Sequence, residues 1–224
     1  MKKDDLQIQT TADGSHTLYV EDLDEHYHSW HGAIRESQHV FVEKGLKEVA
    51  TNEIQLLEIG FGTGLNAYLT CLEASKNHRQ VRYDALEKWP LNREIVQKLN
   101  YIPLVGEDDN GCFDTLFQAP WEKQTAISSF FSIRKMHGDF LSFQPRERWY
   151  HVIYFDAFAP EKQPEMWQEQ PMRKLYDALV PGGILVTYCA KGAVKRMLRT
   201  IGYRVESLPG PPGKREMIRA VRPE

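Results

Sequence analysis

Three glycines interrupt the chain directly after a short apolar segment, and their spacing suits a ligand-binding turn. The run Ile54–Ile59 predicts a strand, and Gly60, Gly62 and Gly64 follow it before a helical pattern begins. Glycine lets a ligand approach the backbone closely, and the N-terminus of the next helix offers free N–H groups and partial positive charge. Ligands of open α/β sheets bind at the carboxyl ends of such strands, so this turn is the first candidate site.

Two classes of ligand compete for the turn. The dinucleotide pattern G-x-G-x-x-G/A fails from Gly60, because its third position falls on Leu65, and from Gly62 it gives only a loose match ending on Ala67. The pattern E/D-x-G-x-G-x-G is met in full, beginning at Glu58. It resembles motif I of the class I S-adenosylmethionine-dependent methyltransferases. Their cofactor has no pyrophosphate, so an acid at the strand end is tolerated and can hold its ammonium group through water or backbone.

Two further acids stand where a nucleoside could be bound. Glu87 ends the predicted strand Val81–Leu86, and a carboxylate there can accept hydrogen bonds from ribose hydroxyls in either ligand class. Asp139 follows His137-Gly138 and could accept a hydrogen bond from an adenine amino group, although a turn or capping aspartate is an equally good interpretation.

Asp156 is the candidate catalytic residue. It directly follows the predicted strand His151–Phe155, and prolines at 160 and 164 constrain the loop behind it. A capping or turn aspartate is the alternative. An alkyl amine is mostly protonated at neutral pH and must lose a proton before its nitrogen can attack a methyl group. Asp156 could position the ammonium group, or more boldly accept its proton.

The surrounding pattern predicts an α/β fold with a doubly wound, mostly parallel sheet. Residues 51–224 are expected to form this domain, and residues 1–50 an N-terminal extension. The second half of the sequence predicts two helices, Glu165–Leu179 and Lys191–Ile201, with a turn at Pro181–Gly183 and a strand at Ile184–Tyr188 between them. The last two predicted strands, Tyr203–Leu208 and Met217–Val221, form a hairpin that adds an antiparallel edge. The first half predicts, with weaker signals, a strand Thr17–Val20, a helix Glu36–Lys44, a helix from Pro90, a polar loop Glu107–Asp114 and a strand within Ile127–Ile133.

Composition excludes several classes of protein. The chain has 224 residues, 42% of them hydrophobic and 26% charged, which is typical of one globular domain. No apolar run approaches the ~18 residues of a membrane span, and no secretory signal is visible. Three separated cysteines support neither a zinc ribbon nor a disulfide framework, so a cytoplasmic location is expected. The net charge of −3 argues against non-specific coating of nucleic acid.

Taken together, the motifs resemble the methyltransferase domain of the bacterial tRNA 5-methylaminomethyl-2-thiouridine biosynthesis enzyme, the MnmC family. The resemblance covers roughly residues 27 to 220 and is carried by Glu36-Ser37 with Val40-Phe41, by Gly60 to Asn66 (GFGTGLN), by Glu87-Lys88-Trp89-Pro90, by Gly138-Asp139, by Asp156 to Pro160 with Pro164 to Trp167, and by Gly213 to Met217 (GKREM).

The resemblance implies a methyl transfer from S-adenosylmethionine to the aminomethyl nitrogen of a tRNA wobble uridine. It places the glycines with Glu58, Phe61, Asn66 and Lys88 around the cofactor, Glu87 at ribose, Asp139 at adenine and Asp156 at the amine. Phe158 and Trp167 are candidates for stacking on the flipped base. Better-known members carry a flavin-dependent oxidoreductase domain, which this sequence does not include. A stand-alone methyltransferase that depends on other enzymes for the aminomethyl nucleoside is therefore expected.

A basic C-terminal segment supports an RNA partner. From Lys191 onward the chain carries nine basic and three acidic residues. A solvated face with protective edge charges is the alternative interpretation. With the family resemblance, Lys214 and Arg215 become the best candidates for contacts to tRNA.

Other functions stay open at this point. An aminopropyltransferase uses a related cofactor on the same fold, a nicotinamide-dependent oxidoreductase would bind a dinucleotide, and a degenerate fold could bind RNA without turnover. His26, His28, His31 and His39 invite a metal site, but no cysteine or carboxylate completes a familiar set, so no metal is predicted. Tyr27 and Glu36 are instead candidates to close over the cofactor.

Overall fold

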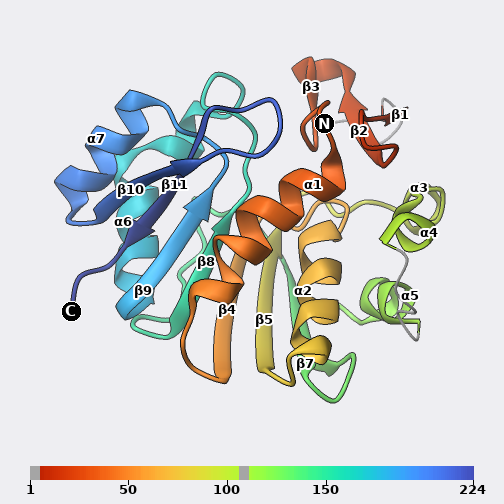
Figure 1. Ribbon diagram of the computed structural model, residues 1–224, viewed down its shortest axis with the longest axis horizontal. Helices are drawn as coiled ribbons and strands as arrows, with labels where there is room; N and C mark the ends of the chain where they lie inside the picture. Colours follow the sequence, from red (N-terminus) through yellow and green to blue (C-terminus); the bar gives the residue numbers. More distant parts are fainter. Residues whose placement is uncertain (1–5, 106–110) are drawn as a thin grey trace.

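An eight-stranded sheet forms the centre of the computed structural model, which describes residues 6–105 and 111–224 (Figure 1). The strand order is β10-β11-β9-β8-β4-β5-β7-β6, with β9, β8, β4, β5 and β7 parallel. The strands are β4 (Glu53–Ile59), β5 (Gln80–Glu87), β6 (Thr125–Ala126), β7 (Phe131–His137), β8 (Tyr150–Phe155), β9 (Leu179–Thr187), β10 (Arg204–Pro209) and β11 (Glu216–Val221). The predicted mostly parallel sheet with an antiparallel C-terminal hairpin is confirmed.

The order of the strands sets where a site can form. β4 lies between β5, the next long strand in the chain, and β8, which the chain reaches only after completing the other edge. The connections therefore leave β4 and β8 in opposite directions, and a crevice opens at the carboxyl ends of these two strands. The glycine turn follows β4 and Asp156 follows β8, so the two strongest sequence signals meet there.

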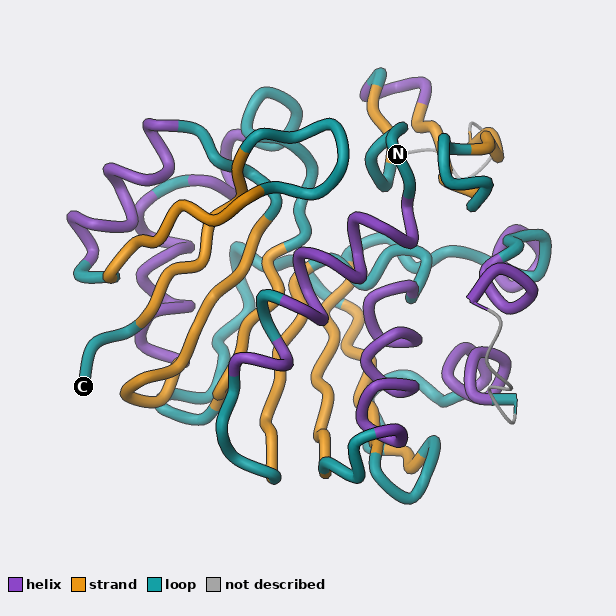
Figure 2. The backbone as a smooth tube through the Cα atoms, in the orientation of Figure 1, coloured by secondary structure: helices purple, strands orange, loops and turns teal. Residues whose placement is uncertain are grey.

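Helices cover both faces of the sheet, because alternate residues of each strand point to opposite sides (Figure 2). On β4, Leu56 packs in the cluster with α1, α2 and α5, whereas Leu57 packs in the cluster with α6 and α7. The helices are α1 (Ala33–Ser37), a π-helix η3 (Gln38–Glu43), η4 (Leu46–Glu48), α2 (Leu65–Lys76), α3 (Arg93–Val96), α4 (Tyr101–Val105), α5 (Cys112–Gln118), η5 (Pro164–Trp167), α6 (Glu169–Ala178) and α7 (Gly192–Ile201).

The N-terminal segment builds a small sheet of its own beyond the end of β4. Its antiparallel strands are β1 (Leu6–Thr10), β2 (His16–Val20) and β3 (Glu25–His26), with the turn η2 (Glu21–Leu23) between the last two. Only the strand at 17–20 was predicted. The predicted helix Glu36–Lys44 begins earlier, at Ala33, and its second half is the π-helix. Phe41 is buried against Tyr154 of β8, with ring centroids 5.1 Å apart.

Three sequence predictions were wrong in detail for reasons of backbone chemistry. The helix predicted for Glu165–Leu179 is broken at Gln168, because Pro171 has no N–H and fits only the first turn of a helix. The turn at Pro181–Gly183 is a bulge inside β9, where Gly182 (φ 76°) donates its N–H to the backbone oxygen of Arg222. The helix expected from Pro90 is the single turn α3, whose start is capped by the Asn92 side chain.

The middle segment differs most from its prediction. Residues 107–110 of the predicted polar loop lie outside the described residues, and residues 112–114 begin helix α5. The strand predicted within Ile127–Ile133 starts only at Phe131, because residues 127–131 form the turn between β6 and β7. Within the two described ranges, no helix is both long and apolar enough to cross a membrane.

We expect Phe41→Ala to lower the free energy of unfolding by about 3–5 kcal/mol, because the large side chain is buried between η3 and the sheet. Lys47→Ala, an exposed position of the same segment, should cost less than about 1 kcal/mol. Urea denaturation of both variants measures this difference. A cost for Phe41→Ala as small as that for Lys47→Ala would show that the segment does not pack on the sheet.

Candidate active site

A cavity of about 440 Å³ lies at the carboxyl ends of the parallel strands. Its floor is the turn after β4, and its sides come from the ends of β5 and β8 and from the loops after β7 and β9. The segment from Glu25 to Trp30 and the loop before β11 close the remaining side. Residues near both ends of the chain therefore complete a cavity whose floor, the glycine turn, was predicted from the sequence.

The three glycines of the turn are required because other parts of the protein pack closely against them. Each has a positive φ, 93° at Gly60, 50° at Gly62 and 74° at Gly64. A Cβ on Gly60 would lie 2.6 Å from the backbone oxygen of Asp156, and one on Gly62 would lie 3.0 Å from the Tyr27 ring. A Cβ on Gly64 would meet Phe117 at 2.7 Å. Contacts within the chain thus explain all three glycines, and this evidence for a ligand is weaker than the sequence suggested.

Glu87 holds the turn in place. Its carboxylate accepts the N–H of Gly62 at 2.9 Å on one oxygen and the N–H of Trp89 at 2.7 Å on the other. Burial raises the pKa of Glu87, and these backbone hydrogen bonds oppose that shift. Each carboxylate oxygen has a second lone pair, so Glu87 can still accept hydrogen bonds from a ligand in the cavity.

Asn66 connects two carboxylates at the start of α2. Its amide nitrogen donates to Glu58 at 2.9 Å and to Asp156 at 2.8 Å. Glu58 is completely buried, and burial raises its pKa well above the ordinary value. Asp156 faces the cavity, whereas Glu58 lies behind Asn66 and does not line it. The predicted influence of Glu58 on a ligand therefore passes through Asn66.

The environment of Asp156 shifts its protonation into the physiological range. Removal from solvent is the largest cause and raises the pKa of Asp156 from 3.8 to about 7, with a further contribution from the negative charge of Glu36. The hydrogen bond from Asn66 and the positive charge of Lys214 act in the opposite direction. A carboxyl group in this state can both bind a cation and accept a proton near neutral pH.

The far end of the cavity is more open. Asp139 forms an ion pair with Lys88 at 2.7 Å and accepts the N–H of Leu141 at 2.9 Å. The contact with Lys88 is the largest cause of the lowered pKa of Asp139. The half-exposed ring of Trp89 lies beside Lys88, 4.4 Å from its ammonium group. The sequence analysis assigned no role to Trp89, although the residue belongs to the motif Glu87-Lys88-Trp89-Pro90 quoted there.

Two of the predicted substrate residues are not in this cavity. Trp167 is buried, donates its indole N–H to the backbone oxygen of Phe158 at 2.7 Å, and packs edge-on against Phe155. Its predicted stacking on a base is wrong, because the ring is committed to the core under the loop. Arg215 lines a neighbouring open groove instead. Phe158 and Lys214 do line the cavity, and Gly64 sits behind its wall.

The N-terminal segment supplies walls of the cavity, among them Tyr27 and Glu36, which the sequence analysis named as candidates to close over the cofactor. The Tyr27 ring lies across the turn at Gly62 and stacks edge-on against Phe158, with centroids 5.3 Å apart. His28 is buried, and burial lowers its pKa to about 4, so it is neutral at pH 7. Tyr188, after β9, also lines the cavity and was missed. No spacing rule relates these positions to the glycine turn.

The four N-terminal histidines do not converge. His26 contacts Gln9, His39 contacts the backbone of Pro209, and His28 lies near Thr63. Among the residues described here, no group of three or more His, Cys, Asp or Glu side chains is arranged to hold a metal ion.

Several proteins with known names are similar to this chain in sequence and in fold. Residues 122–223 match the family described as S-adenosyl-L-methionine-dependent methyltransferase. A crystal structure of MNMC2 from Aquifex aeolicus superposes with a TM-score of 0.77 at 26% identity, covering 97% of this chain and 70% of that one. Over residues 122–223 the chain is similar to the S-adenosyl-L-methionine-dependent methyltransferases. The predicted class I fold and the predicted cofactor are confirmed with it.

The curated relatives are longer proteins. Over 92% of its length this methyltransferase is 30% identical to the tRNA 5-methylaminomethyl-2-thiouridine biosynthesis bifunctional protein MnmC of Cupriavidus necator. It is 29% identical, over 96% of its length, to the protein of that name from Pseudoalteromonas atlantica. The chain spans 33% of each relative, so the predicted resemblance to MnmC is confirmed for that part. A spermidine synthase from Thermotoga maritima shares the fold alone, at 17% identity and a TM-score of 0.55.

The cavity fits S-adenosylmethionine in size and in chemistry. Its volume lies within the range of small-molecule sites. Acids at the ends of β5 and β7 can face hydroxyl and amino groups of a nucleoside, and Gly60 and Gly62 present bare backbone at the floor. Apolar side chains, including Ile59, Leu86 and Phe140, supply walls for a planar base.

We expect Gly60→Ala to abolish measurable binding of S-adenosylhomocysteine and to lower the free energy of unfolding by roughly 2–3 kcal/mol, because the new Cβ would overlap the backbone of Asp156. Gly182→Ala is the matched control, since Gly182 also has a positive φ but nothing within 4 Å of an added Cβ. That variant should lose only about 1 kcal/mol and keep full binding. Calorimetry and denaturation decide between them, and equal effects of the two substitutions would contradict the proposed crowding at Gly60.

The raised pKa of Asp156 has a stability signature. Because the folded-state pKa of about 7 lies above the ordinary value of 3.8, the wild-type chain loses stability as pH rises from about 4 through 7. Relative to wild type, Asp156→Asn should gain roughly 2–4 kcal/mol of unfolding free energy between about pH 4 and pH 8. Denaturant titrations at a series of pH values measure this. A difference between Asp156→Asn and wild type that does not change with pH would refute the shift.

Proposed function

We propose that this protein transfers a methyl group from S-adenosylmethionine to the aminomethyl nitrogen of 5-aminomethyluridine, or its 2-thio form, at the wobble position of tRNA. The observation that carries the proposal is Asp156, a solvent-shielded carboxylate that faces the cavity beside the glycine turn. Such a group suits a substrate that arrives as an alkylammonium ion. The names of the relatives, which refer to tRNA 5-methylaminomethyl-2-thiouridine biosynthesis, support tRNA as the acceptor.

We assign the cofactor by matching its parts to the walls of the cavity. The backbone at Gly60, Phe61 and Gly62, with the Asn66 amide, is proposed to surround the methionine end, close to Asp156. Glu87 would accept hydrogen bonds from the ribose hydroxyls. Asp139, held by Lys88, would accept one from the adenine amino group. This orientation brings the reactive end of the cofactor toward Asp156 and leaves the base at the more open end.

The chemistry required of the chain is modest. Bound S-adenosylmethionine supplies a methyl group on a positively charged sulfur, which leaves with the electron pair of the broken C–S bond. The chain must bind the ammonium group, remove one of its protons and aim the nitrogen lone pair at the methyl carbon. Asp156 is proposed to bind the ammonium group and accept that proton, which its pKa near neutrality permits. The proton then passes to solvent.

The RNA is proposed to lie over the open groove beside the cavity. This groove is lined by Lys191, Arg215 and Pro160 among others, and it shares Tyr188 and Lys214 with the cavity. Arg215 would contact phosphate groups next to the flipped nucleotide. Phe158, which lines the cavity, is the remaining candidate for contact with the base. The aminomethyl group of the acceptor is proposed to be supplied by a separate enzyme.

We expect Asp156→Asn to lower the rate of methyl transfer about 100- to 10,000-fold while affinity for S-adenosylhomocysteine changes only a few-fold, because the variant keeps its shape but can neither bind the cation nor accept a proton. Single-turnover kinetics and calorimetry measure the two quantities. Asp114→Asn should leave both unchanged. An equal loss of cofactor binding in Asp156→Asn would assign Asp156 to the cofactor instead.

The proposal as a whole is tested with labelled S-adenosylmethionine and two preparations of bulk tRNA, one from cells that lack this gene and one from wild-type cells. Label on 5-aminomethyl wobble uridines of the first preparation alone is the expected result. Label on another amine, or on none while cofactor binding persists, would overturn the assigned acceptor. Mass spectrometry of the digested nucleosides identifies the product.

A further inference from the structure

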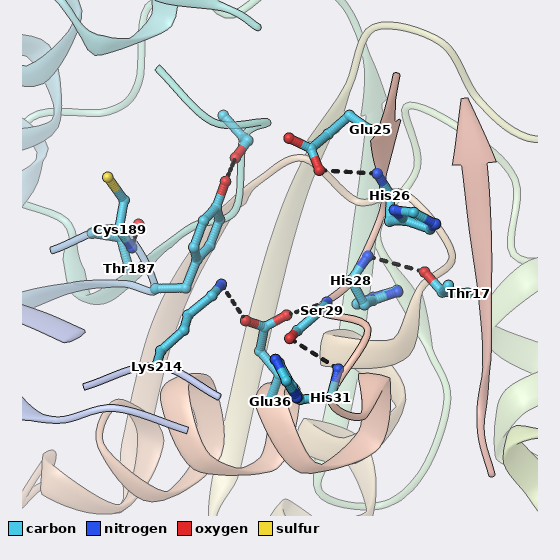
Figure 3. A network of polar contacts seen from close by, with 12 residues as sticks. Thr17, Glu25, His26, His28, Ser29, His31, Glu36, Thr187, Cys189 and Lys214 are labelled. Carbon is cyan, nitrogen blue, oxygen red and sulfur yellow. Dashed lines mark hydrogen bonds and ion pairs between the residues drawn. The ribbon is translucent and has the colours of Figure 1, made fainter. Parts of the chain in front are cut away.

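An ion pair between the two ends of the chain stands in the wall of the cavity. The ammonium group of Lys214 lies 2.6 Å from one carboxylate oxygen of Glu36, and the other oxygen accepts the N–H of Ser29 at 2.7 Å (Figure 3). Glu36 is almost fully buried, with 8% of its side chain exposed, whereas 31% of the Lys214 side chain is exposed. A buried carboxylate of this kind needs a cation.

An aromatic ring completes the surroundings of this ammonium group. The Lys214 nitrogen lies 3.9 Å from the centre of the Tyr188 ring. The Tyr188 hydroxyl donates to the backbone oxygen of Ala157 at 2.9 Å. Because Ala157 directly follows Asp156 in the sequence, this hydrogen bond ties the Tyr188 side chain to the loop that carries Asp156. A carboxylate and an aromatic face together form a recognised environment for an alkylammonium ion.

The charges at this end of the cavity leave room for one more cation. Among the described residues at this end of the cavity, the carboxylates of Asp156, Glu36 and Glu25 outnumber the ammonium group of Lys214. Lys214 carries the same chemical group as the proposed substrate, a primary amine on a flexible alkyl chain. Lys214 lines both the cavity and the open groove, so its ammonium group can be placed in the groove when it leaves the cavity.

The loop that carries Lys214 is held by the N-terminal segment. Gly213 (φ 83°) packs so closely on His31 that an added Cβ would lie 1.9 Å from the ring, and the backbone of Pro209 accepts a hydrogen bond from His39. The main chain at Lys214 is therefore fixed, and only its side chain is free to move. Displacement of the ammonium group requires no opening of the site.

We propose, on the basis of the amine methylation proposed above, that Glu36 and Tyr188 complete, beside Asp156, the subsite for the substrate's alkylammonium group. Lys214 occupies this subsite until the substrate displaces it. Glu36 is then a specificity-determining residue that selects an amine over a neutral group. Once displaced into the groove, Lys214 can contact an RNA phosphate.

Several titratable groups surround this subsite and bear on its charge. Besides the ion pair itself they come from the strand β3 and the residues that follow it, from β4, from β8 and from the end of β9: Glu25, His28, Glu58, Asp156 and Tyr188. His28 is neutral at pH 7, with its pKa lowered to about 4 by burial. The carboxylates of Glu36, Asp156 and Glu25 are accordingly the groups that a cation meets at this end of the cavity.

The test compares two anticodon stem-loops that differ only at the wobble base, one with 5-aminomethyluridine and one with 5-hydroxymethyluridine. Affinities are measured in the presence of S-adenosylhomocysteine, so that no transfer occurs, and their ratio is the amine preference. We expect Glu36→Gln to lower this preference about tenfold, the size of one charge-assisted hydrogen bond. Lys214→Met should raise it several-fold, because the internal competitor is gone.

Two further variants keep the test decisive. Lys214→Met leaves a buried carboxylate unpaired, which destabilises the fold. The neutral double variant Glu36→Gln/Lys214→Met avoids this cost, and its preference should equal that of Glu36→Gln. Lys195→Met removes a different ion pair, to Glu216 of the same hairpin, and should leave the preference unchanged.

Opposite shifts in Glu36→Gln and Lys214→Met support the subsite. Shifts in the same direction, or a preference constant within about twofold, would assign the pair a purely structural role and overturn the inference. The methyl-transfer assay separates this failure from that of the proposed function. A chain that methylates the aminomethyl RNA without these shifts keeps the function and loses the subsite. An amine preference that depends on Glu36 without methyl transfer keeps the subsite and changes the acceptor.

Discussion

The amide of Asn66 holds two carboxylates together where neither is freely hydrated, and the geometry of the cavity depends on that contact. Asn66 donates to Glu58 at the end of β4 and to Asp156 after β8. A parallel pair of strands ends here with two carboxyl groups that are largely removed from solvent, and the shared amide donor satisfies an oxygen of each. The same contact leaves Asp156 facing the cavity, with its pKa raised to about 7.

The remaining structure can be understood as support for this arrangement. The glycine turn allows the backbone after β4 to pass within contact of Asp156, and Glu87 fixes that turn from β5. Helix α1 and the loop of the C-terminal hairpin then meet at the opening, joined by the ion pair of Glu36 and Lys214. Neighbouring strands build the proposed cofactor end of the cavity, whereas segments far apart in the sequence build the proposed acceptor end.

This division explains what could be predicted from the sequence. The glycine turn, Glu87 and Asp156 follow strands that are recognisable by their apolar runs, so topology alone places them together. Trp167 could not be placed, since a buried and a stacking tryptophan look the same in a sequence. Tyr188, His28 and the pairing of Glu36 with Lys214 depend on long-range packing of irregular segments, which no local period encodes. Pro171 was visible, but its effect on the helix was overlooked.

A crystal structure of the protein with S-adenosylhomocysteine and a 5-aminomethyluridine nucleoside tests the central claim most directly. The account predicts the sulfur of the cofactor product beside Gly60 and Asn66, its adenine toward Asp139, and the aminomethyl nitrogen in contact with Asp156. A cofactor product bound in the reverse orientation, or an amine placed away from Asp156, would contradict it.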